Sequence, residues 1–308
     1  MSAHAAGSSL DVKTAPKSAP LKAWFMAARP RTLVAGVVPV AVGSAVAVSE
    51  YAFRLLPALA ALLGALLIQV GTNMANDYFD WKKGADTSER LGPARVTAQG
   101  LIAPEQVWWG AIACFAAAMV IGFYLVSVGG WPILVIGLLS IAAGYAYTGG
   151  PFPLGYNGLG DVFVMIFFGF VAVCGSYFVQ TGRISSLVLA ASVPVGALGV
   201  ALLAVNNVRD ADTDAKAGKR TLVVRFGRGF GRAEYVIMLL VAFAVPAALW
   251  GSGAASAAVL VSYAAVPLAV PPLKRVLREQ GATLNVALAG TAKLQWIFGL
   301  LFAAGLAW

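Results

Sequence analysis

The stretch LLPALAALLGALLIQVGTNMANDYFDWKKGADT (55–87) decides the fold class of this chain. It begins with an apolar run that contains no charged residue before Asp77, and it ends in a cluster of Asn and Asp side chains. A helix that spans a bilayer needs about 20 mostly apolar residues. We therefore expect a membrane-spanning helix over 55–79, with its polar end at the point where the helix leaves the bilayer.

The composition of the whole chain agrees with this interpretation. Of the 308 residues, 60% are hydrophobic and 11% are charged, and the mean hydropathy is +0.81. A soluble globular domain carries about 25% charged residues. These values exclude a soluble enzyme, a disordered protein and a basic protein that binds nucleic acid. We expect no nucleic-acid partner, so the net charge of +9 needs another explanation.

Apolar runs of spanning length recur along the chain. Helices are the expected spanning element, because no segment shows the alternation typical of barrel strands. The nine expected spans lie near 30–49, 55–79, 105–127, 131–148, 159–181, 185–207, 233–251, 255–273 and 287–307. The sequence thus predicts an all-α, polytopic membrane protein, with a single transmembrane domain over 23–308 and a disordered cytoplasmic tail over 1–22.

The basic residues predict the orientation of this bundle. Loops rich in Lys and Arg stay on the cytoplasmic side of a membrane. If the N-terminus is cytoplasmic, 19 of the 22 basic residues lie on that side. The opposite side then has only Arg54 and Arg183, and Lys293 lies within the last span. We expect a multi-pass protein of a bacterial cytoplasmic membrane, with its C-terminus outside.

A polar face is expected at the end of the second span. Asn73, Asn76, Asp77 and Asp80 follow one another at i, i+3, i+4 and i+7. Residues at this spacing share one side of a helix. The sequence therefore predicts a stripe of oxygen-bearing side chains there.

A second polar face follows the sixth span, in NNVRDADTDAKAGKRT (206–221). Asn206, Asp210 and Asp214 lie at i, i+4 and i+8 and share one stripe, whereas Asp212 lies off it and is expected to pair with a base of the loop. Both stripes meet the same side of the membrane. Carboxylate oxygens together with substrate phosphates are the ligands that Mg²⁺ prefers.

Basic side chains accompany both clusters. Arg90 and Arg95 follow the first cluster, and Lys219 and Arg220 follow the second. Such groups neutralise phosphate, so we expect a diphosphate whose hydrophobic tail lies in the bundle. The alternative is a solvated rim of salt bridges. Two equivalent clusters in an acid-poor chain favour a site, because polar groups in membranes are costly and usually functional.

Five segments resemble a known family: RPRTL (29–33), NDYFDWKKGADT (76–87), RVTAQGLI (95–102), YTGGPFPLGYNGLGD (147–161) and NNVRDADTDAKAGKRTL (206–222). They are similar to motifs of the UbiA superfamily of intramembrane aromatic prenyltransferases. Together they resemble its MenA branch, which prenylates 1,4-dihydroxy-2-naphthoate in menaquinone biosynthesis. One position departs from the superfamily's first motif, because Gly84 stands where an acid is common and Asp86 follows it. The resemblance implies nine helices and cytoplasmic active-site loops.

The resemblance also implies a reaction and a division of roles. The reaction is Mg²⁺-dependent transfer from polyprenyl diphosphate to 1,4-dihydroxy-2-naphthoate, with decarboxylation. The implied metal ligands are Asp77, Asp80, Asp86, Asp210 and Asp214. The implied catalytic groups are Asp77, Asp80, Asp210, Asp214, Lys219 and Arg220, which act on the departing diphosphate. The implied substrate-binding residues in and beside the motifs are Asn73, Asn76, Arg90, Arg95, Asn206 and Asn207.

Departure of the diphosphate leaves an allylic cation, and both this cation and the acceptor need side chains that bind them. Aromatic rings stabilise an allylic cation in a dry pocket, although packing is the alternative role of such residues. The aromatic candidates are Tyr145, Tyr147, Phe168 and Tyr177. Arg29 or Arg31 either binds the naphthoate carboxylate or anchors the chain at the membrane. Lys293 either binds substrate or extends its amine to the membrane surface.

Two other functions remain open at this point. One is a UbiA-type prenyltransferase with another aromatic acceptor, such as 4-hydroxybenzoate or homogentisate. The other is an ion-coupled transporter that uses the Asp residues as cation sites. Transporter sites tend to lie near the bilayer midplane, whereas these acids lie at the ends of spans.

Overall fold

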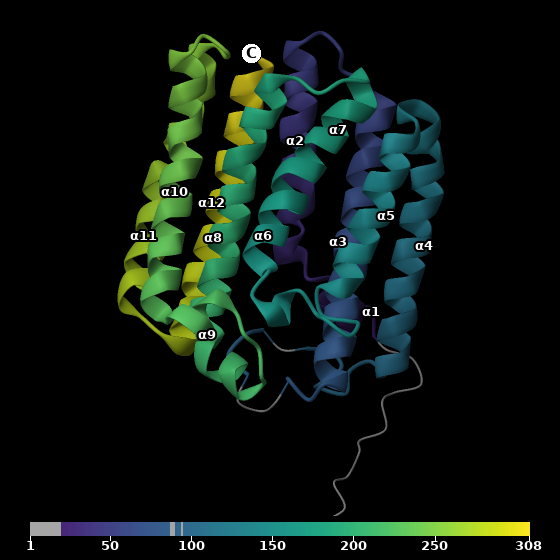
Figure 1. The fold of residues 1–308 in the computed structure, drawn as a ribbon, viewed down its shortest axis with the longest axis vertical. Coiled ribbons are helices and arrows are strands. Elements are labelled where there is room, and N and C mark those ends of the chain that lie inside the picture. Colours follow the sequence, from purple (N-terminus) through teal and green to yellow (C-terminus); the bar gives the residue numbers. More distant parts are fainter. Residues whose placement is uncertain (1–19, 87–89, 94) are drawn as a thin grey trace, which may run out of the picture.

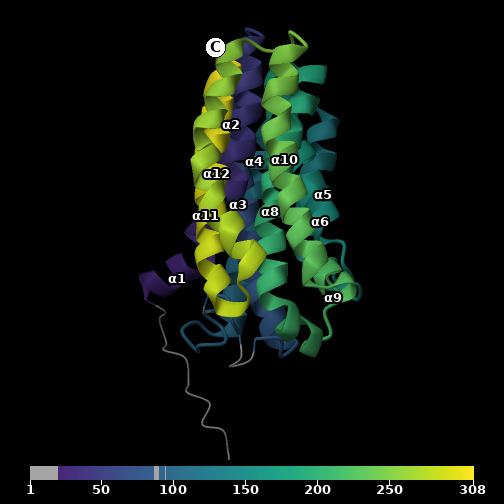
Figure 2. The same ribbon diagram turned by 90° about the vertical axis from the view of Figure 1, so that its left-hand side faces the viewer.

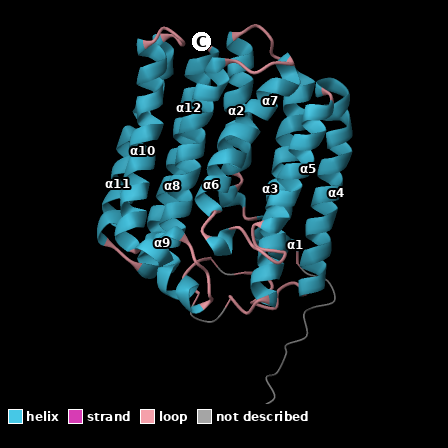
Figure 3. Cartoon of the chain, viewed as in Figure 1, coloured by secondary structure: helices cyan, strands magenta, loops and turns pink. Residues whose placement is uncertain are grey.

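The computed structural model describes residues 20–86, 90–93 and 95–308, and at Arg31 the backbone alone. The described residues form a bundle of long helices joined by short loops, and they contain no β-strand (Figures 1 and 3). The expected all-α fold is confirmed. Most of the tail expected over 1–22 lies outside the described residues, and the first helix begins at Leu21.

The helix bounds follow the expected runs closely. The α-helices are α1 (Leu21–Ala28), α2 (Val34–Ser49), α3 (Leu55–Lys82), α4 (Pro104–Gly129), α5 (Trp131–Ala146), α6 (Gly160–Val164), α7 (Ala172–Thr181), α8 (Ser186–Lys216), α9 (Leu222–Phe226), α10 (Arg228–Gly251), α11 (Val266–Arg278) and α12 (Leu284–Ala307). The 3₁₀-helices are η1 (Pro30–Thr32), η2 (Gly155–Asn157), η4 (Ala257–Ala265) and η5 (Gly281–Thr283). The segment η3 (Met165–Val171) is a π-helix.

Each expected span corresponds to a helical rod in the described part of the chain. Seven rods are long and apolar enough to cross a membrane. The remaining two expected spans correspond to α2 and α5, which are apolar and shorter, at 16 residues each. Helices α6 and α7 are joined through η3 into one rod over Gly160–Thr181. The chain is therefore a multi-pass membrane protein.

Helix α8 extends beyond the expected end near 207 and finishes at Lys216. Its polar end contains no glycine or proline before Gly218, so nothing in the sequence interrupts the backbone hydrogen bonds there. The second motif therefore lies on α8 as far as Lys216 and continues in the turn that follows, and Asp210 and Asp214 share one face of α8 as the spacing predicts.

The eighth expected span is less regular, and three prolines explain why. It consists of η4 followed by α11, with Pro267 in the first turn of α11 and Pro271 and Pro272 inside that helix. A proline in a first turn removes no helical hydrogen bond, whereas an interior proline removes one. The rod is thus helical over 257–278 in two segments.

The arrangement of the rods brings the two motifs together. Helices α3, α4 and α5 lie on one side and α8, α10, α11 and α12 on the other, with α2 and the α6–α7 rod between them (Figures 1 and 2). The polar ends of α3 and α8 finish at the same end of the bundle, which we call the motif end, and the C-terminus lies at the opposite end. One buried core joins α2, α7, α8, α10 and α12, and a smaller one joins α1, α3 and α4.

Candidate active site

A cavity of about 300 Å³ lies between the motif ends of α3 and α8. Its polar wall combines acidic, basic and amide side chains from both motifs and from the loops beside them. These lining residues are Arg29, Gln69, Asn73, Asn76, Asp80, Arg90, Arg95, Tyr156, Asn206, Asn207, Arg209, Asp210, Asp214 and Lys219. The two stripes predicted from helical spacing therefore face a common space, with the exception of Asp77.

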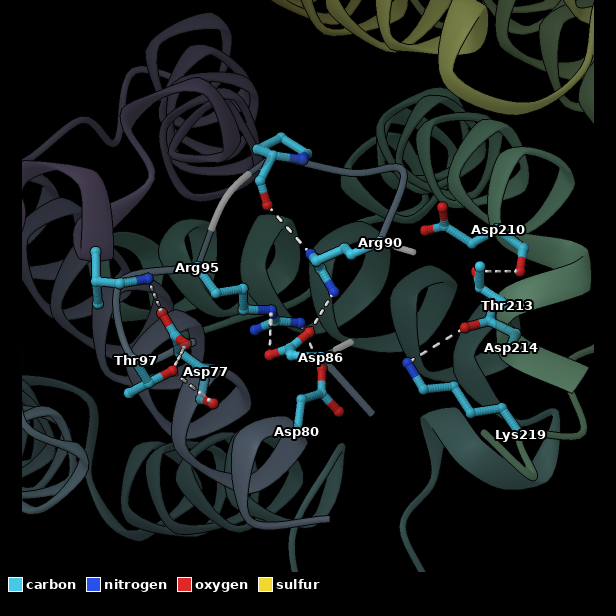
Figure 4. Close-up of polar contacts among 12 residues, drawn as sticks. Asp77, Asp80, Asp86, Arg90, Arg95, Thr97, Asp210, Thr213, Asp214 and Lys219 are labelled. Carbon is cyan, nitrogen blue, oxygen red and sulfur yellow. Dashed lines mark hydrogen bonds and ion pairs between the residues drawn. The ribbon is translucent and has the colours of Figure 1, made fainter. Parts of the chain in front are cut away.

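Asp80 is the carboxylate that the first motif presents to this cavity. One oxygen accepts a hydrogen bond from the Tyr156 hydroxyl at 2.7 Å, and the other is bound by Arg95. Arg95 also lies 3.2 Å from Asp86, whose second oxygen is 2.6 Å from Arg90 (Figure 4). Asp86 does not line the cavity and instead holds the two arginines from behind. Burial raises the pKa of the Asp86 carboxyl above its usual value, although Arg95 and Arg90 act in the opposite direction.

Asp77 belongs to the same helical stripe as Asp80, but its carboxylate does not face the cavity. Its side chain is buried, accepts hydrogen bonds from the Thr97 hydroxyl and, at 3.3 Å, from the Val96 N–H, and does not line the cavity (Figure 4). The segment around residue 96 packs against this side of α3 and supplies donors that α3 alone lacks. In this structure Asp77 anchors the loop that carries Arg90 and Arg95.

The second motif presents Asp210 and Asp214. Arg209 is buried and binds both oxygens of Asp210, at 2.8 and 2.6 Å, and Lys219 lies 3.3 Å from Asp214. Asp212 points away and pairs with Arg228 at 2.7 Å, with 75% of its side chain exposed. The expectation that Asp212 pairs with a base of the loop is confirmed.

The four asparagines of the motifs all line the cavity. Asn73 donates hydrogen bonds to the Ala28 carbonyl at 3.0 Å and to the Thr32 hydroxyl at 3.1 Å, which fixes the turn that carries Arg29. Asn76 accepts a hydrogen bond from the Thr148 hydroxyl. The first motif therefore also holds the neighbouring loops in place.

Arg29 is a half-buried cation at the cavity wall. Within the part of the chain that the structure describes, it forms no ion pair, and burial together with the nearby Arg95 lowers the pKa of its guanidinium to about 9. A half-buried arginine that forms no ion pair is stabilised when it binds an anion. The side chain of Arg31 is not among the described atoms. Arg220 does not line the cavity, and its backbone N–H donates to the Tyr156 carbonyl at 2.7 Å.

The structure brings only some of the other candidate residues to the cavity. Tyr147 and Phe168 line it. Tyr145 packs against Phe79 and Trp108 and does not line it. The remaining two candidates lie elsewhere: Tyr177 is buried and donates a hydrogen bond to Glu50, and Lys293 is exposed on α12.

Tyr156 and Arg209 are site residues that the spacing argument did not select. Tyr156 lies in a segment that carries the family resemblance, and Arg209 lies next to Asp210 in another. Their position within these segments is the sequence signal that could have identified them. Burial raises the pKa of the Tyr156 phenol above its usual range, and the negative charge of Asp80 raises it further. The phenol is therefore a hydrogen-bond donor at neutral pH.

The polar cavity adjoins an apolar groove of about 210 Å³. The residues that line both spaces are Ala35, Gln69, Thr72, Tyr147, Val164 and Phe168. The remaining wall of the groove consists largely of Gly and Ala residues together with Ile, Val and Phe, from α2 to α7. Such a space accepts an extended hydrocarbon whose anionic head lies among the arginines.

The donor set fits a divalent cation bound together with an anion. Asp80, Asp210 and Asp214 offer carboxylate oxygens to one cavity, and Asn76 offers an amide oxygen. The described residues contain no group of three or more His, Cys, Asp or Glu side chains close enough to hold a metal by themselves. Substrate phosphates would complete the coordination, as is usual for Mg²⁺.

These features are typical of enzymes that act inside the membrane on a lipid diphosphate. The chain belongs to the UbiA prenyltransferase family, whose sequence model matches residues 36–297. It is a membrane-embedded prenyltransferase.

Relatives of known name and structure agree with this assignment. The chain is 36% identical over 299 residues to the 1,4-dihydroxy-2-naphthoate octaprenyltransferase of Haemophilus influenzae, covering 93% of this chain and 96% of that one. It is 36% identical over 284 residues to the enzyme of the same name from Bacillus subtilis, covering 90% of each chain. A UbiA homologue from Archaeoglobus fulgidus, solved with GPP and Mg²⁺, has the same fold, with a TM-score of 0.64 at 15% identity over 93% of this chain and 100% of that one.

The groove makes a testable prediction about the tail of the substrate. Gly137 lines the groove on α5, and a Cβ atom added there would meet no atom within 4 Å. It lies ten residues before Tyr147, or about 15 Å along the helix. We expect Gly137→Trp to lower transfer from a long polyprenyl diphosphate by at least about ten-fold and to spare dimethylallyl diphosphate, as measured by product formation with each donor.

The matched control is Leu138→Trp, because Leu138 is exposed on the outer face of α5 and does not line the groove. An equal loss with both donors in Gly137→Trp, or an equal loss in the control, would show that the groove does not hold the tail.

Proposed function

We propose that the protein transfers a polyprenyl group from polyprenyl diphosphate to 1,4-dihydroxy-2-naphthoate, with loss of carbon dioxide, in menaquinone biosynthesis. The observation that carries the proposal is the common cavity, in which Asp80 from α3 faces Asp210 and Asp214 from α8 next to an apolar groove. The names of the relatives from Haemophilus influenzae and Bacillus subtilis support the choice of acceptor.

Asp80, Asp210 and Asp214, with Asn76, would hold Mg²⁺ together with the diphosphate. The chemistry supplied by bound Mg²⁺ is neutralisation of the negative charge that develops on the leaving diphosphate. The same carboxylates are neutralised here by Arg95, Arg209 and Lys219. The homologue solved with GPP and Mg²⁺ supports the choice of metal.

The cationic side chains at the cavity wall bind and stabilise the leaving group. Arg90, Arg95 and Lys219 line the space where the diphosphate lies, and their charge favours breaking of the allylic C–O bond, whose electron pair leaves with the diphosphate. Tyr147 and Phe168 lie at the junction of the cavity and the groove. Their rings face the developing allylic cation and keep water away from it.

Arg29 positions the acceptor by binding its carboxylate. The ring carbon that carries this carboxylate then forms the new C–C bond with the allylic carbon. The bond from that ring carbon to the carboxyl group breaks, carbon dioxide leaves, and the electron pair restores the aromatic ring. Arg29 suits this role because it lines the cavity, is half-buried and forms no ion pair with an acid among the described residues.

We place the motif end in the cytoplasm and the C-terminus outside, in a bacterial cell membrane. The loops at the motif end carry most of the basic residues, and such loops stay cytoplasmic. This orientation lets Mg²⁺ and the water-soluble naphthoate reach the cavity from the cytoplasm.

The test is a transfer assay with purified protein, Mg²⁺ and a polyprenyl diphosphate, offered 1,4-dihydroxy-2-naphthoate, 4-hydroxybenzoate or homogentisate in turn. The acceptors are labelled in the carboxyl carbon, so that carbon dioxide release is measured together with the prenylated product. We expect release and product with the naphthoate alone. Preferred use of another acceptor would identify a different branch of the family, and liposome uptake of a cation without transfer would support a transporter.

A further inference from the structure

Tyr156 contacts residues of both motifs through one side chain. It lies in η2, within the uncharged loop between α5 and α6. Its hydroxyl donates to Asp80 at 2.7 Å. The amine of Lys83, just after α3, lies 4.4 Å from the centre of its ring, and the amine of Lys219, just after α8, lies 4.9 Å from it. The phenol thus joins the ends of two helices that are far apart in sequence.

The backbone around Tyr156 is held at the same two places. Its carbonyl accepts from the Arg220 N–H at 2.7 Å, and the Asn157 carbonyl accepts from the Arg225 guanidinium at 2.9 Å. On the other side, the amine of Lys83 donates to the Thr148 carbonyl at 2.5 Å. The loop therefore bridges the segment after α3 and the segment after α8.

Gly158 permits this close approach. Its φ is +78°, and a Cβ atom there would lie 2.8 Å from the Arg220 carbonyl oxygen. A larger residue would push the loop away from the segment after α8. The backbone therefore allows Tyr156 to reach Asp80 only because this position is a glycine.

We propose that Tyr156 is a positioning residue that ties the two Asp motifs into one diphosphate site. Its hydroxyl orients Asp80, and its ring keeps the ammonium groups of Lys83 and Lys219 in place beside the cavity. This inference rests on the proposed function, because it assigns Tyr156 a role in binding the diphosphate and its cation.

The two partners of Asp80 behave differently when a ligand binds. A carboxylate has about four acceptor sites, so Asp80 can keep the hydrogen bond from Tyr156 while it binds a cation. Arg95 is itself a cation and exchanges Asp80 for the phosphates. Hydrogen-bonding partners of this kind orient a metal-binding carboxylate, and their loss typically lowers metal affinity by about 10- to 100-fold.

The experiment compares Tyr156→Phe, Tyr156→Leu and wild type as purified full-length protein. The probe is inorganic pyrophosphate with Mg²⁺, and binding is measured by calorimetry. Tyr156→Phe removes the hydroxyl but keeps the ring, and we expect about ten-fold weaker binding. Tyr156→Leu also removes the ring between the two lysines, and binding weakens further. Transfer assays add a second readout: Tyr156→Phe raises the Mg²⁺ concentration for half-maximal rate and changes kcat at saturating Mg²⁺ by less than about two-fold.

The control is Tyr78→Phe. Tyr78 lies at the same end of α3, stacks on Trp108 and has Lys82 at 5.7 Å, but it has no carboxylate partner in any described contact. We expect the Tyr78→Phe variant to bind the probe as tightly as wild type does.

The outcomes separate this inference from the function. If wild type binds the probe and transfers the prenyl group while Tyr156→Phe binds as tightly, or more tightly, the positioning role is wrong and the function stands. If Tyr156→Phe and Tyr156→Leu weaken binding equally, the hydroxyl acts and the ring does not, which overturns the role given to the lysines. If wild type neither binds the probe nor transfers, the proposed function fails as well.

Discussion

Asp210→Asn is expected to lower prenyl transfer by at least about 10³-fold while the protein still folds. The change removes a negative charge from the wall of the cavity, where the structure offers few carboxylates to a cation. The fold is retained because Asn285 still accepts a hydrogen bond from Arg209 at 2.8 Å and the substituted side chain still offers an oxygen. The rate is measured with saturating donor and naphthoate over a range of Mg²⁺ concentrations, and the fold by thermal unfolding.

Asp80→Asn on α3 is expected to act in the same way, because Asp80 faces Asp210 across the cavity. The matched control is Asp212→Asn, which changes the same residue type in the second motif at an exposed position paired with Arg228. The control stays within about two-fold of wild type. Undiminished transfer by either Asp210→Asn or Asp80→Asn would remove the basis for the proposed metal and diphosphate site.

Arg95→Gln is expected to destabilise the protein by about 3–5 kcal/mol as well as to abolish transfer, because it leaves the buried Asp80 and Asp86 without their shared cation. Arg95 has 7% of its side chain exposed, so solvent does little to screen the carboxylates that remain. The loss is measured as a lower midpoint of thermal unfolding. Transfer falls because the same guanidinium binds the diphosphate in the proposed mechanism.

The double variant Arg95→Gln/Asp86→Asn separates the two effects. Neutralising Asp86, which then has only Arg90 as a partner, removes one of the two buried carboxylate charges that Arg95 bridged, so the unfolding midpoint rises part of the way back to that of wild type while transfer stays lost. A midpoint of the double variant at or below that of Arg95→Gln would contradict the ion-pair account of this loop.

The sequence alone was sufficient to predict the fold and to predict which polar residues share a helix face. An apolar run of about 20 residues has one stable arrangement in a bilayer, because its backbone must form all its hydrogen bonds internally. All nine expected spans therefore correspond to helical rods, even where the prolines near 267–272 divide one of them. The helical period placed Asp210 and Asp214 on one face and Asp212 off it, since these relations depend only on the turn of a single helix.

The tertiary structure decided what each polar group contacts. Asp77 belongs to the same stripe as Asp80, but the loop at Val96 and Thr97 packs over it and takes its carboxylate away from the cavity. Tyr145, Tyr177 and Lys293 lie in or near predicted spans and do not line the cavity, because the way the rods pack, and not the sequence spacing, sets which face looks inward.

Tyr156 is a residue of the cavity that the helical spacing did not predict. Its contacts with Asp80 and Lys219 join segments that are 76 and 63 residues away in the chain, and no local pattern encodes such a meeting. Periodicity along one helix is a local property, whereas pairing between helix ends depends on how whole rods and loops pack. The sequence by itself therefore determined the membrane bundle and its two acidic stripes, and only the packed structure determined which side chains share the cavity between them.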